Sequence, residues 1–394
     1  MSPGIGSDLT VFAISPGIGS YLTVFAMSPG IGSYLTVFAV AAGVTLVITP
    51  VVRRISERWD FMVEPDARRI HERSTALLGG VAMFTGFLSA MGVAWLLDDF
   101  DVVFAAASEA VGIVIAGLVM IAFGTYDDVR EMSAPAKVAS MVLAGSILSF
   151  TGVTVLNLRL PVVGALILSQ DLAFLITVLW LVAIVNAINL IDGLDGLAAG
   201  IVAIAGITFF VYSVKLTDDE VLLPNNIGPL VAITAGGVAV GFLPHNFHRA
   251  RIFMGDGGAL FLGTLLAAST VSVGGRSSEP FAGQTYFLFA PMLIPLIILA
   301  VPVVDVLWAV LRRTRARTSL TTPDKEHLHH RLMSLGHGHR RSVLILWLFT
   351  ALMSTLVLYP TYAGGGEAIV VPAAAVLVLM LYTVFHPILR RRTP

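Results

Sequence analysis

Long apolar runs separated by short polar segments dominate this chain. A helix needs about 20 mainly apolar residues to cross the hydrocarbon layer of a bilayer, and the pattern predicts eleven such spans. Helices are the expected form because lipid leaves every backbone polar group to be satisfied within the protein. The spans are predicted near residues 33–52, 79–97, 110–126, 136–156, 173–190, 197–214, 227–243, 257–273, 287–311, 342–359 and 368–386. The expected fold class is therefore an all-α, polytopic membrane helix bundle.

The composition agrees with this interpretation and excludes several functions. Of the 394 residues, 56% are hydrophobic and only 12% are charged, whereas about a quarter is usual in soluble proteins. Cysteine is absent, which excludes disulfides, thiolate nucleophiles and cysteine metal sites. A net charge of −1 argues against a nucleic-acid partner.

The basic residues are distributed unevenly between the two sides of such a bundle. Eleven spans put the termini on opposite sides, and 21 of the 24 Lys and Arg residues then fall on one side. The other side holds only Arg159, Lys215 and Arg276. Because Lys and Arg concentrate in cytoplasmic loops, the bias predicts an outer N-terminus and a cytoplasmic C-terminus in a bacterial plasma membrane.

The first 39 residues contain three near-copies of a 13-residue unit that ends in LTVFA. Pro and Gly in each copy disfavour a helix, and the unit is shorter than solenoid repeats. We interpret residues 1–32 as a non-catalytic tandem duplication, with Met27 as a candidate initiator. Residues 33–394 are expected to form the catalytic transmembrane domain.

Four polar motifs fall on the predicted cytoplasmic face. TYDDVRE (125–131) ends the third span, and NAINLIDGLDG (186–196) joins the fifth span to the sixth. PHNFHRARIFMGDGG (244–258) joins the seventh to the eighth, and PDKEHLHHRL (323–332) lies in a long basic loop. An active site at the membrane interface needs several loops that each donate acids, amides, imidazoles or cations to one face. The pattern predicts such a site here.

The first two motifs predict oxygen-rich chemistry. Asp127 and Asp128 are close enough to bind Mg²⁺ or to share a proton, with a simple helix cap as the alternative. A spacing of three places Asn186, Asn189 and Asp192 on one broad helical face.

Two glycines then loosen that helix, so that Asp192 and Asp195 are expected in a turn at the membrane surface. A polar loop between two spans is the alternative. Amides and acids inside an apolar run are costly, however, and are usually functional.

Asp256 is flanked by glycines that would let a ligand approach the backbone. The helix predicted to begin there would favour phosphate at its N-terminus, while a plain helix cap is the alternative for Asp256.

The last motif carries His327, His329 and His330 beside Arg331. Because Arg331 and Lys325 lie close in sequence and cysteine is absent, phosphate contact is favoured over a zinc site. His337 and His339, in the sequence GHGH, are interpreted as loop residues outside the site. Together the motifs predict Mg²⁺ chemistry that joins a phosphate-bearing donor to a lipid acceptor.

The order DD, NAxNxxDGxDGL, FMGD and HLHHRL resembles the polyprenyl-phosphate N-acetylhexosamine-1-phosphate transferases. Those enzymes move a sugar phosphate from a UDP-sugar to a phosphorylated polyprenol and release UMP. The resemblance runs from about residue 50 to 335, and HLHHRL is similar to the branch that uses UDP-N-acetylglucosamine. It implies a UDP-sugar and a polyprenyl phosphate as partners in the membrane, Mg²⁺ or Mn²⁺ as cofactor, and no nucleic acid. A homodimer is compatible with it.

The resemblance also implies a role for each matching residue. Asn189 and Asp256 match metal ligands, and the substrate-binding set is Asn186, Asp192, Asp195 and Arg331. The catalytic set is Asp127, Asp128, Lys137, His327, His329 and His330.

One departure and two alternatives stand beside this interpretation. Ala76 and Leu77 occupy positions where the family carries Pro and Arg, which puts one basic contact in doubt; Arg73 is a candidate replacement. The alternatives are a phospho-N-acetylmuramoyl-pentapeptide transferase of the same family and a cation-coupled transporter. The transporter is disfavoured because its polar groups would gather near the midplane of the membrane.

Overall fold

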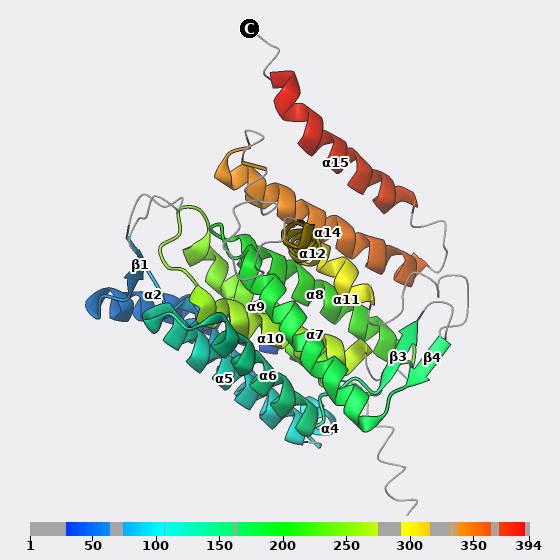
Figure 1. Cartoon of the computed structure of the whole chain (residues 1–394). Helices are drawn as coiled ribbons and strands as arrows, with labels where there is room; N and C mark the ends of the chain where they lie inside the picture. The colour runs from blue at the N-terminus through cyan, green and yellow to red at the C-terminus, as the bar shows by residue number, and fades with distance from the viewer. Residues whose placement is uncertain are drawn as a thin grey trace, which may run out of the picture.

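A computed structural model describes residues 29–63, 74–105, 107–160, 164–274, 293–315, 332–333, 337–363 and 370–390. Within these residues the fold is a helix bundle with two short β-hairpins (Figure 1). One hairpin pairs β1 (Met62–Val63) with β2 (Thr75–Ala76), and the other pairs β3 (Asn157–Leu160) with β4 (Gly164–Ile167). The helices are α2 (Ile31–Arg58), α3 (Gly79–Trp95), η2 (Asp98–Phe100), α4 (Asp101–Phe104), α5 (Ala107–Arg130), α6 (Ala134–Phe150), α7 (Gln170–Ile191), α8 (Leu197–Asp218), α9 (Gly228–Asn246), α10 (Gly255–Gly274), α11 (Leu293–Ile298), α12 (Ala300–Arg315), α14 (His339–Ala363) and α15 (Val370–Arg390).

Seven of the described helices are long and apolar enough to cross a membrane: α2, α5, α7, α8, α9, α10 and α14. An eighth arises if α3 and the short helices after it, which meet at a bend of 91°, count as one span. The predicted helical membrane bundle is thus confirmed in its architecture. The number eleven and the orientation in the membrane stay predictions.

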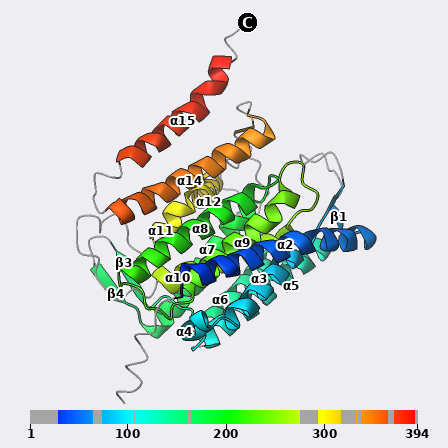
Figure 2. The ribbon, with the colours of Figure 1, turned by 180° about the vertical axis from the view of Figure 1, so that it is seen from behind.

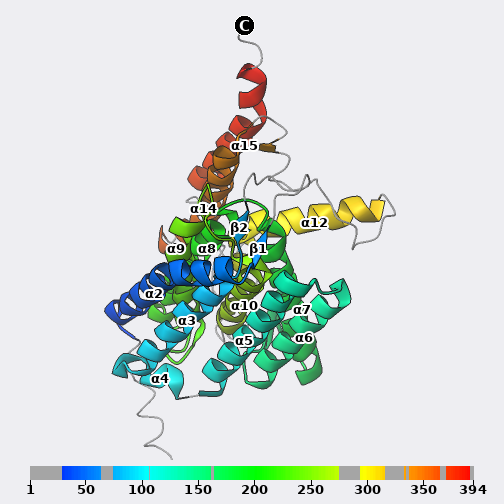
Figure 3. The same cartoon turned by 90° about the vertical axis from the view of Figure 1, so that its left-hand side faces the viewer.

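The ninth predicted span, 287–311, is not one continuous helix where the structure describes it. Its described part is divided between α11 and α12, which are separated by a turn at Leu299. Figure 3 shows α12 extending sideways from the other helices. The α12 sequence explains this, because it mixes apolar residues with arginines and so forms an amphipathic rather than a uniformly apolar helix.

The third N-terminal repeat extends into the bundle. Helix α2 begins at Ile31, directly after Pro29 and Gly30, two residues before the predicted domain boundary. The Tyr34 ring is buried, with its centroid 5.1 Å from that of Phe100 and 4.9 Å from that of Phe210. Residues 1–28 lie outside the described part of the chain.

Helix α10 is the central element of the bundle and packs against α3, α5, α7, α8 and α9. Every residue from Gly257 to Gly274 is buried. The sequence permits this because small residues let helices approach closely in a membrane protein. A Cβ on Gly263, for example, would lie 2.7 Å from the Cα of Val185 on α7.

The helix ends that carry the polar motifs share one end of the bundle. Figures 1 and 2 show the β1 strand near this end and the β3–β4 hairpin at the opposite one. The ends of α5, α7 and α9 meet the beginnings of α6, α10 and α14 there, as the contacts below show. Three of the four predicted motifs therefore converge, while residues 323–331 of the fourth lie outside the described residues.

Candidate active site

An acidic cluster around Lys137 forms the centre of the candidate site. Lys137, near the beginning of α6, lies 2.5 Å from Oδ2 of Asp127 and donates a second hydrogen bond to Oδ2 of Asp256. Asp127 is at the end of α5 and Asp256 at the start of α10, so one ammonium group connects three helices. The backbone N–H of Met132 also donates to Asp127, over 2.5 Å. These contacts bring the acid pair, Lys137 and Asp256 together.

Asp128 points differently from its neighbour Asp127. Its carboxylate accepts the backbone N–H groups of Asp256, over 2.8 Å, and of Gly257, over 3.2 Å. These are N–H groups of the first turn of α10, which have no partner within the helix. A carboxylate at that position also interacts favourably with the helix dipole. Asp128 therefore fixes the helix that carries Asp256.

The expected phosphate site at the N-terminus of α10 is not open. Asp128 occupies two of the N–H groups, and a third, that of Gly258, donates to the carbonyl of Met254. The glycines on either side of Asp256, Gly255 and Gly257, are needed for close packing and backbone conformation, and they do not open the backbone to a ligand. A Cβ on Gly257 would lie 2.9 Å from the Thr125 hydroxyl, and Gly255 has φ +69°, a conformation that favours glycine.

A backbone ladder holds the loop before Asp256. The N–H of Phe253 donates to the carbonyl of Ala76, and the N–H groups of Gly79 and Gly80 donate to the carbonyls of Phe253 and Met254. The segment with the departure at Ala76 and Leu77 thus positions FMGD through its main chain, which does not depend on those side chains. Arg73 lies outside the described residues.

The polar residues of α7 point to two places. Asn186 donates to the carbonyl of Val182, over 2.7 Å, and to the sulfur of Met141 on α6, over 3.1 Å. Asn189 is half-buried one turn after Val185, the residue that meets α10, and residues four apart share a helix face. Asn189 therefore lies on the α10 side of α7, towards Asp256.

Asp192 follows the last residue of α7 and faces the acidic cluster. Burial of its carboxyl group, together with the charges of Asp256, Asp128 and Asp195, raises the pKa of Asp192 to about 8. Part of the residue stays exposed, so a ligand can reach it. A carboxyl in such surroundings favours a nearby cation or a hydrogen-bond acceptor at neutral pH.

Asp195 lies in a second cluster, among histidines. Its Oδ2 accepts the backbone N–H of Ala250, over 3.1 Å, and lies 3.4 Å from Nδ1 of His248 and 4.0 Å from Nε2 of His339. The two imidazole centroids are 4.7 Å apart. Together with Asp195, these histidines form a histidine cluster next to the acidic cluster.

Sequence reasoning missed three residues of this region. His339 was assigned to a loop outside the site, but it is the first residue of α14 and lies beside Asp195. His248 and Asn246 were not selected. Buried Asn246 accepts the N–H of Gly196 and donates to the carbonyl of Ile252, each over 3.0 Å. In the sequence, the one feature that points to His248 and Asn246 is that they share the motif 244–258 with Asp256.

His327, His329, His330 and Arg331 lie outside the described residues. Their expected roles, like the roles assigned to the acids and amides above, stay predictions.

Comparison with known proteins decides the family. The decaprenyl-phosphate N-acetylglucosaminephosphotransferase of Mycolicibacterium smegmatis is 35% identical over 356 residues, which cover 88% of this chain and 87% of that protein. The family model of glycosyl transferase family 4 matches residues 110–274. The chain belongs to glycosyl transferase family 4. The matched stretch contains the whole acidic cluster as well as Asp195 and His248.

Two further relatives show the breadth of the family. The probable undecaprenyl-phosphate N-acetylglucosaminyl 1-phosphate transferase of Bacillus subtilis is 34% identical and covers 78% of this chain and 80% of that protein. The phospho-N-acetylmuramoyl-pentapeptide-transferase of Desulforudis audaxviator is 31% identical and covers 79% of this chain and 93% of that protein. The resemblance found in the motifs is thereby confirmed.

Proposed function

We propose that this protein transfers N-acetylglucosamine 1-phosphate from a UDP-sugar to a polyprenyl phosphate in the membrane, with release of UMP. The observation that carries the proposal is the acidic cluster at one end of an apolar bundle, where Asp127, Lys137 and Asp256 meet. Relatives at 34–35% identity bear names with this acceptor and this sugar. The active site faces the cytoplasm, in agreement with the distribution of basic residues.

The donor atoms of the cluster fit a magnesium ion. Mg²⁺ prefers oxygen ligands and is usually held by one or two carboxylates together with substrate phosphates. Asp256 and Asp127 offer carboxylate oxygens, and Asn189 lies on the helix face directed to the same place. The Lys137 ammonium between the two carboxylates indicates that this position stabilises positive charge. Asn189 and Asp256 would hold the ion. When bound, it would neutralise charge on the pyrophosphate of the donor. Mn²⁺ would be able to replace Mg²⁺ at this site.

The other residues of the site have separate roles in the proposed reaction. Lys137 orients Asp127, and Asp127 accepts the proton of the polyprenyl phosphate. Asp128 fixes the start of α10, so that Asp256 keeps its position relative to the pair. Asp192 and Asp195 line the side on which the nucleotide binds, and the histidine motif with Arg331 contacts the phosphates. Phosphoryl transfer depends mainly on such positioning and charge neutralisation.

Release of UMP from a panel of donors tests the proposal. Purified protein would be incubated with Mg²⁺, polyprenyl phosphate and UDP-N-acetylglucosamine, UDP-N-acetylgalactosamine, UDP-glucose or UDP-N-acetylmuramoyl-pentapeptide. We expect UMP only with lipid acceptor present, fastest with UDP-N-acetylglucosamine, and none after chelation until Mg²⁺ or Mn²⁺ is returned. Turnover of the pentapeptide donor alone would replace the proposed sugar, and a lack of UMP with every donor would refute the proposal.

A further inference from the structure

Three side chains that commonly bind metals meet beside the acidic cluster. Asp195 comes from the turn between α7 and α8, His248 from the loop before α10, and His339 from the start of α14. One ligand atom from each lies within 4.8 Å of the others. We propose that Asp195, His248 and His339 form a binding site for a divalent transition-metal ion of the Zn²⁺ type, separate from the oxygen-rich Mg²⁺ site. The site itself is inferred from its geometry alone, whereas its effect on the enzyme rests on the proposed function.

The distances within the histidine cluster suit zinc. A tetrahedral Zn²⁺ with ligands at about 2.0–2.1 Å keeps its ligand atoms about 3.4 Å apart. The Asp195 Oδ2 to His248 Nδ1 distance is 3.4 Å, and the 4.0 Å to Nε2 of His339 requires only a small side-chain rotation. Two imidazoles and one carboxylate form a three-ligand zinc set, which leaves a fourth position for another ligand. Mg²⁺ is disfavoured because it prefers oxygen donors.

The burial of Asp195 adds a physical reason for a cation. The residue is 5% exposed, and a buried carboxylate is costly unless positive charge or hydrogen bonds compensate it. The backbone N–H of Ala250 donates to Oδ2 of Asp195, the oxygen that faces the two histidines. This hydrogen bond would orient the carboxylate, as outer-shell hydrogen bonds do in metal sites. A bound ion would add positive charge and coordination to this carboxylate.

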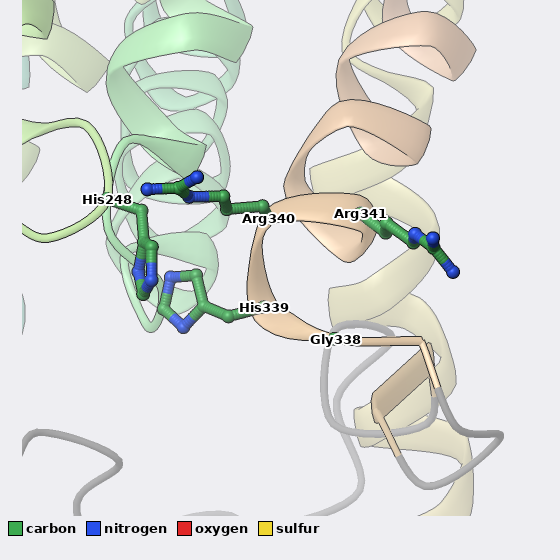
Figure 4. Close-up of a pocket in the computed structure, with 5 residues that line it drawn as sticks. All are labelled: His248, Gly338, His339, Arg340 and Arg341. Carbon is green, nitrogen blue, oxygen red and sulfur yellow. The ribbon is translucent and has the colours of Figure 1, made fainter.

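The histidines line a cavity of about 370 Å³ together with Gly338, Arg340 and Arg341. In Figure 4, Arg340 extends towards His248, while Arg341 points away from the two imidazole rings. The Arg340 charge opposes a bare dication and favours an anion as the fourth ligand. Chloride or phosphate is therefore expected to strengthen metal binding.

A metal ion at this site would connect three segments that the backbone leaves separate. The turn that carries Asp195 also carries Asp192, and the loop that carries His248 leads into Asp256. Occupancy would thus restrict movement of the two segments that carry Asp192 and Asp256. Because the proposed function places Asp195 on the nucleotide side, the ion would also compete with the nucleotide for that carboxylate.

Co²⁺ binding tests this proposal directly, because four-coordinate Co²⁺ absorbs visible light much more strongly, and at longer wavelength, than octahedral Co²⁺ does. Full-length protein purified without a polyhistidine tag would be titrated with Co²⁺ in excess Mg²⁺. We expect one equivalent that produces the four-coordinate spectrum and is displaced by Zn²⁺. His248→Ala and His339→Ala should each weaken this binding by at least about 100-fold. Asp195→Asn should also weaken it, although its amide oxygen can still accept the N–H of Ala250.

Two controls separate this site from other histidines. His245→Ala, in the same loop, removes an imidazole that contacts the carbonyl of Leu46 and should leave the spectrum unchanged. Replacement of His327, His329 and His330 together should also leave this equivalent in place. The proposal is overturned if wild-type protein gives no four-coordinate spectrum, or if that spectrum survives in correctly folded His248→Ala and His339→Ala proteins.

Discussion

The acidic cluster and the histidine cluster lie at the same end of the bundle but solve the problem of buried charge differently. In the acidic cluster, Lys137 supplies a cation to two carboxylates. In the histidine cluster, Asp195 faces two imidazoles and a backbone N–H. The first cluster therefore contains a lysine as countercharge, whereas the second would gain positive charge from the proposed ion. Removing a charge should affect the two clusters in different ways.

The clusters also differ in how they are built. The acidic cluster joins the ends of α5, α6 and α10, and α10 is buried along its whole length after the first two residues. The histidine cluster joins a turn, a loop and the beginning of α14. Helix ends hold side chains more firmly than loops do. We therefore expect catalysis to rely on the first cluster and adjustment of catalysis on the second.

The largest effect is expected from the acidic cluster itself. Asp127→Asn and Asp256→Asn each remove a carboxylate from Lys137. The first also removes the proposed proton acceptor, and the second removes a proposed metal ligand. Loss of one catalytic acid–base or electrostatic group commonly costs about 10²–10⁴-fold, and we expect UMP release to fall by about 1,000-fold.

The matched control for these variants is Glu131→Gln, at an exposed carboxylate next to the end of α5. It should retain the wild-type rate. Near-normal activity in either Asp127→Asn or Asp256→Asn would remove that residue from the proposed active site.

A smaller loss is expected from Asp128, although it is adjacent to Asp127. In Asp128→Asn, the amide oxygen can accept only one N–H group well, and the amide NH₂ would face the other. Hydrogen bonds to charged groups contribute about 1.5–3 kcal/mol each, so the start of α10 loosens and activity falls by about 10–100-fold. The rate of UMP release and the melting temperature should fall together. A catalytic role would instead lower the rate at unchanged melting temperature.

Asn246, which connects the segments of the two clusters, should affect the stability of the protein more than its catalytic rate. Asn246→Ala would leave the buried N–H of Gly196 and the carbonyl of Ile252 without the partner that now joins them. An unsatisfied buried polar group costs about 1–3 kcal/mol, and we expect the melting temperature to fall by several degrees. Asn225→Ala, at an exposed position, is the control. An unchanged melting temperature in Asn246→Ala would mean that the loops are held by other contacts.

The contrast between the clusters also explains what the sequence could predict. The apolar runs predict the helices because span length follows from bilayer thickness. Asp127, Asp192 and Asp256 are visible as charges placed where burial is costly. His248 and His339 are not visible in this way, because they lie in polar segments 91 positions apart in the sequence. In the described part of the chain, α8 packs against both α14 and α9, and this packing brings their segments together.

The different contacts of Asp127 and Asp128 could not be predicted from the sequence for a related reason. Adjacent residues on a helix point about 100° apart, so one of the pair faces α6 and the other faces α10. Which of them faces the lysine depends on how the helices are arranged, and a sequence motif does not contain that information.

The last prediction concerns pH, and it tests whether Asp192 belongs to the acidic cluster. An unfolded aspartate has a pKa of 3.8, whereas that of folded Asp192 is about 8 because of burial and the neighbouring carboxylates. The folded state therefore holds the proton more tightly. Its cost is small below pH 4, grows as the pH rises towards 8, and is constant above that.

Asp192→Asn removes this cost, so its melting temperature should exceed that of the wild type by a margin that grows between pH 5 and pH 8. We expect a margin of a few degrees at pH 8, measured in detergent without divalent cations. Added Mg²⁺ should narrow it, because a nearby cation favours the charged carboxylate. Asp171→Asn, at an exposed aspartate at the start of α7, should show no such trend. A constant or shrinking margin for Asp192→Asn would mean that the charges of Asp128 and Asp256 do not affect this carboxyl. Asp192 would then not belong to the acidic cluster.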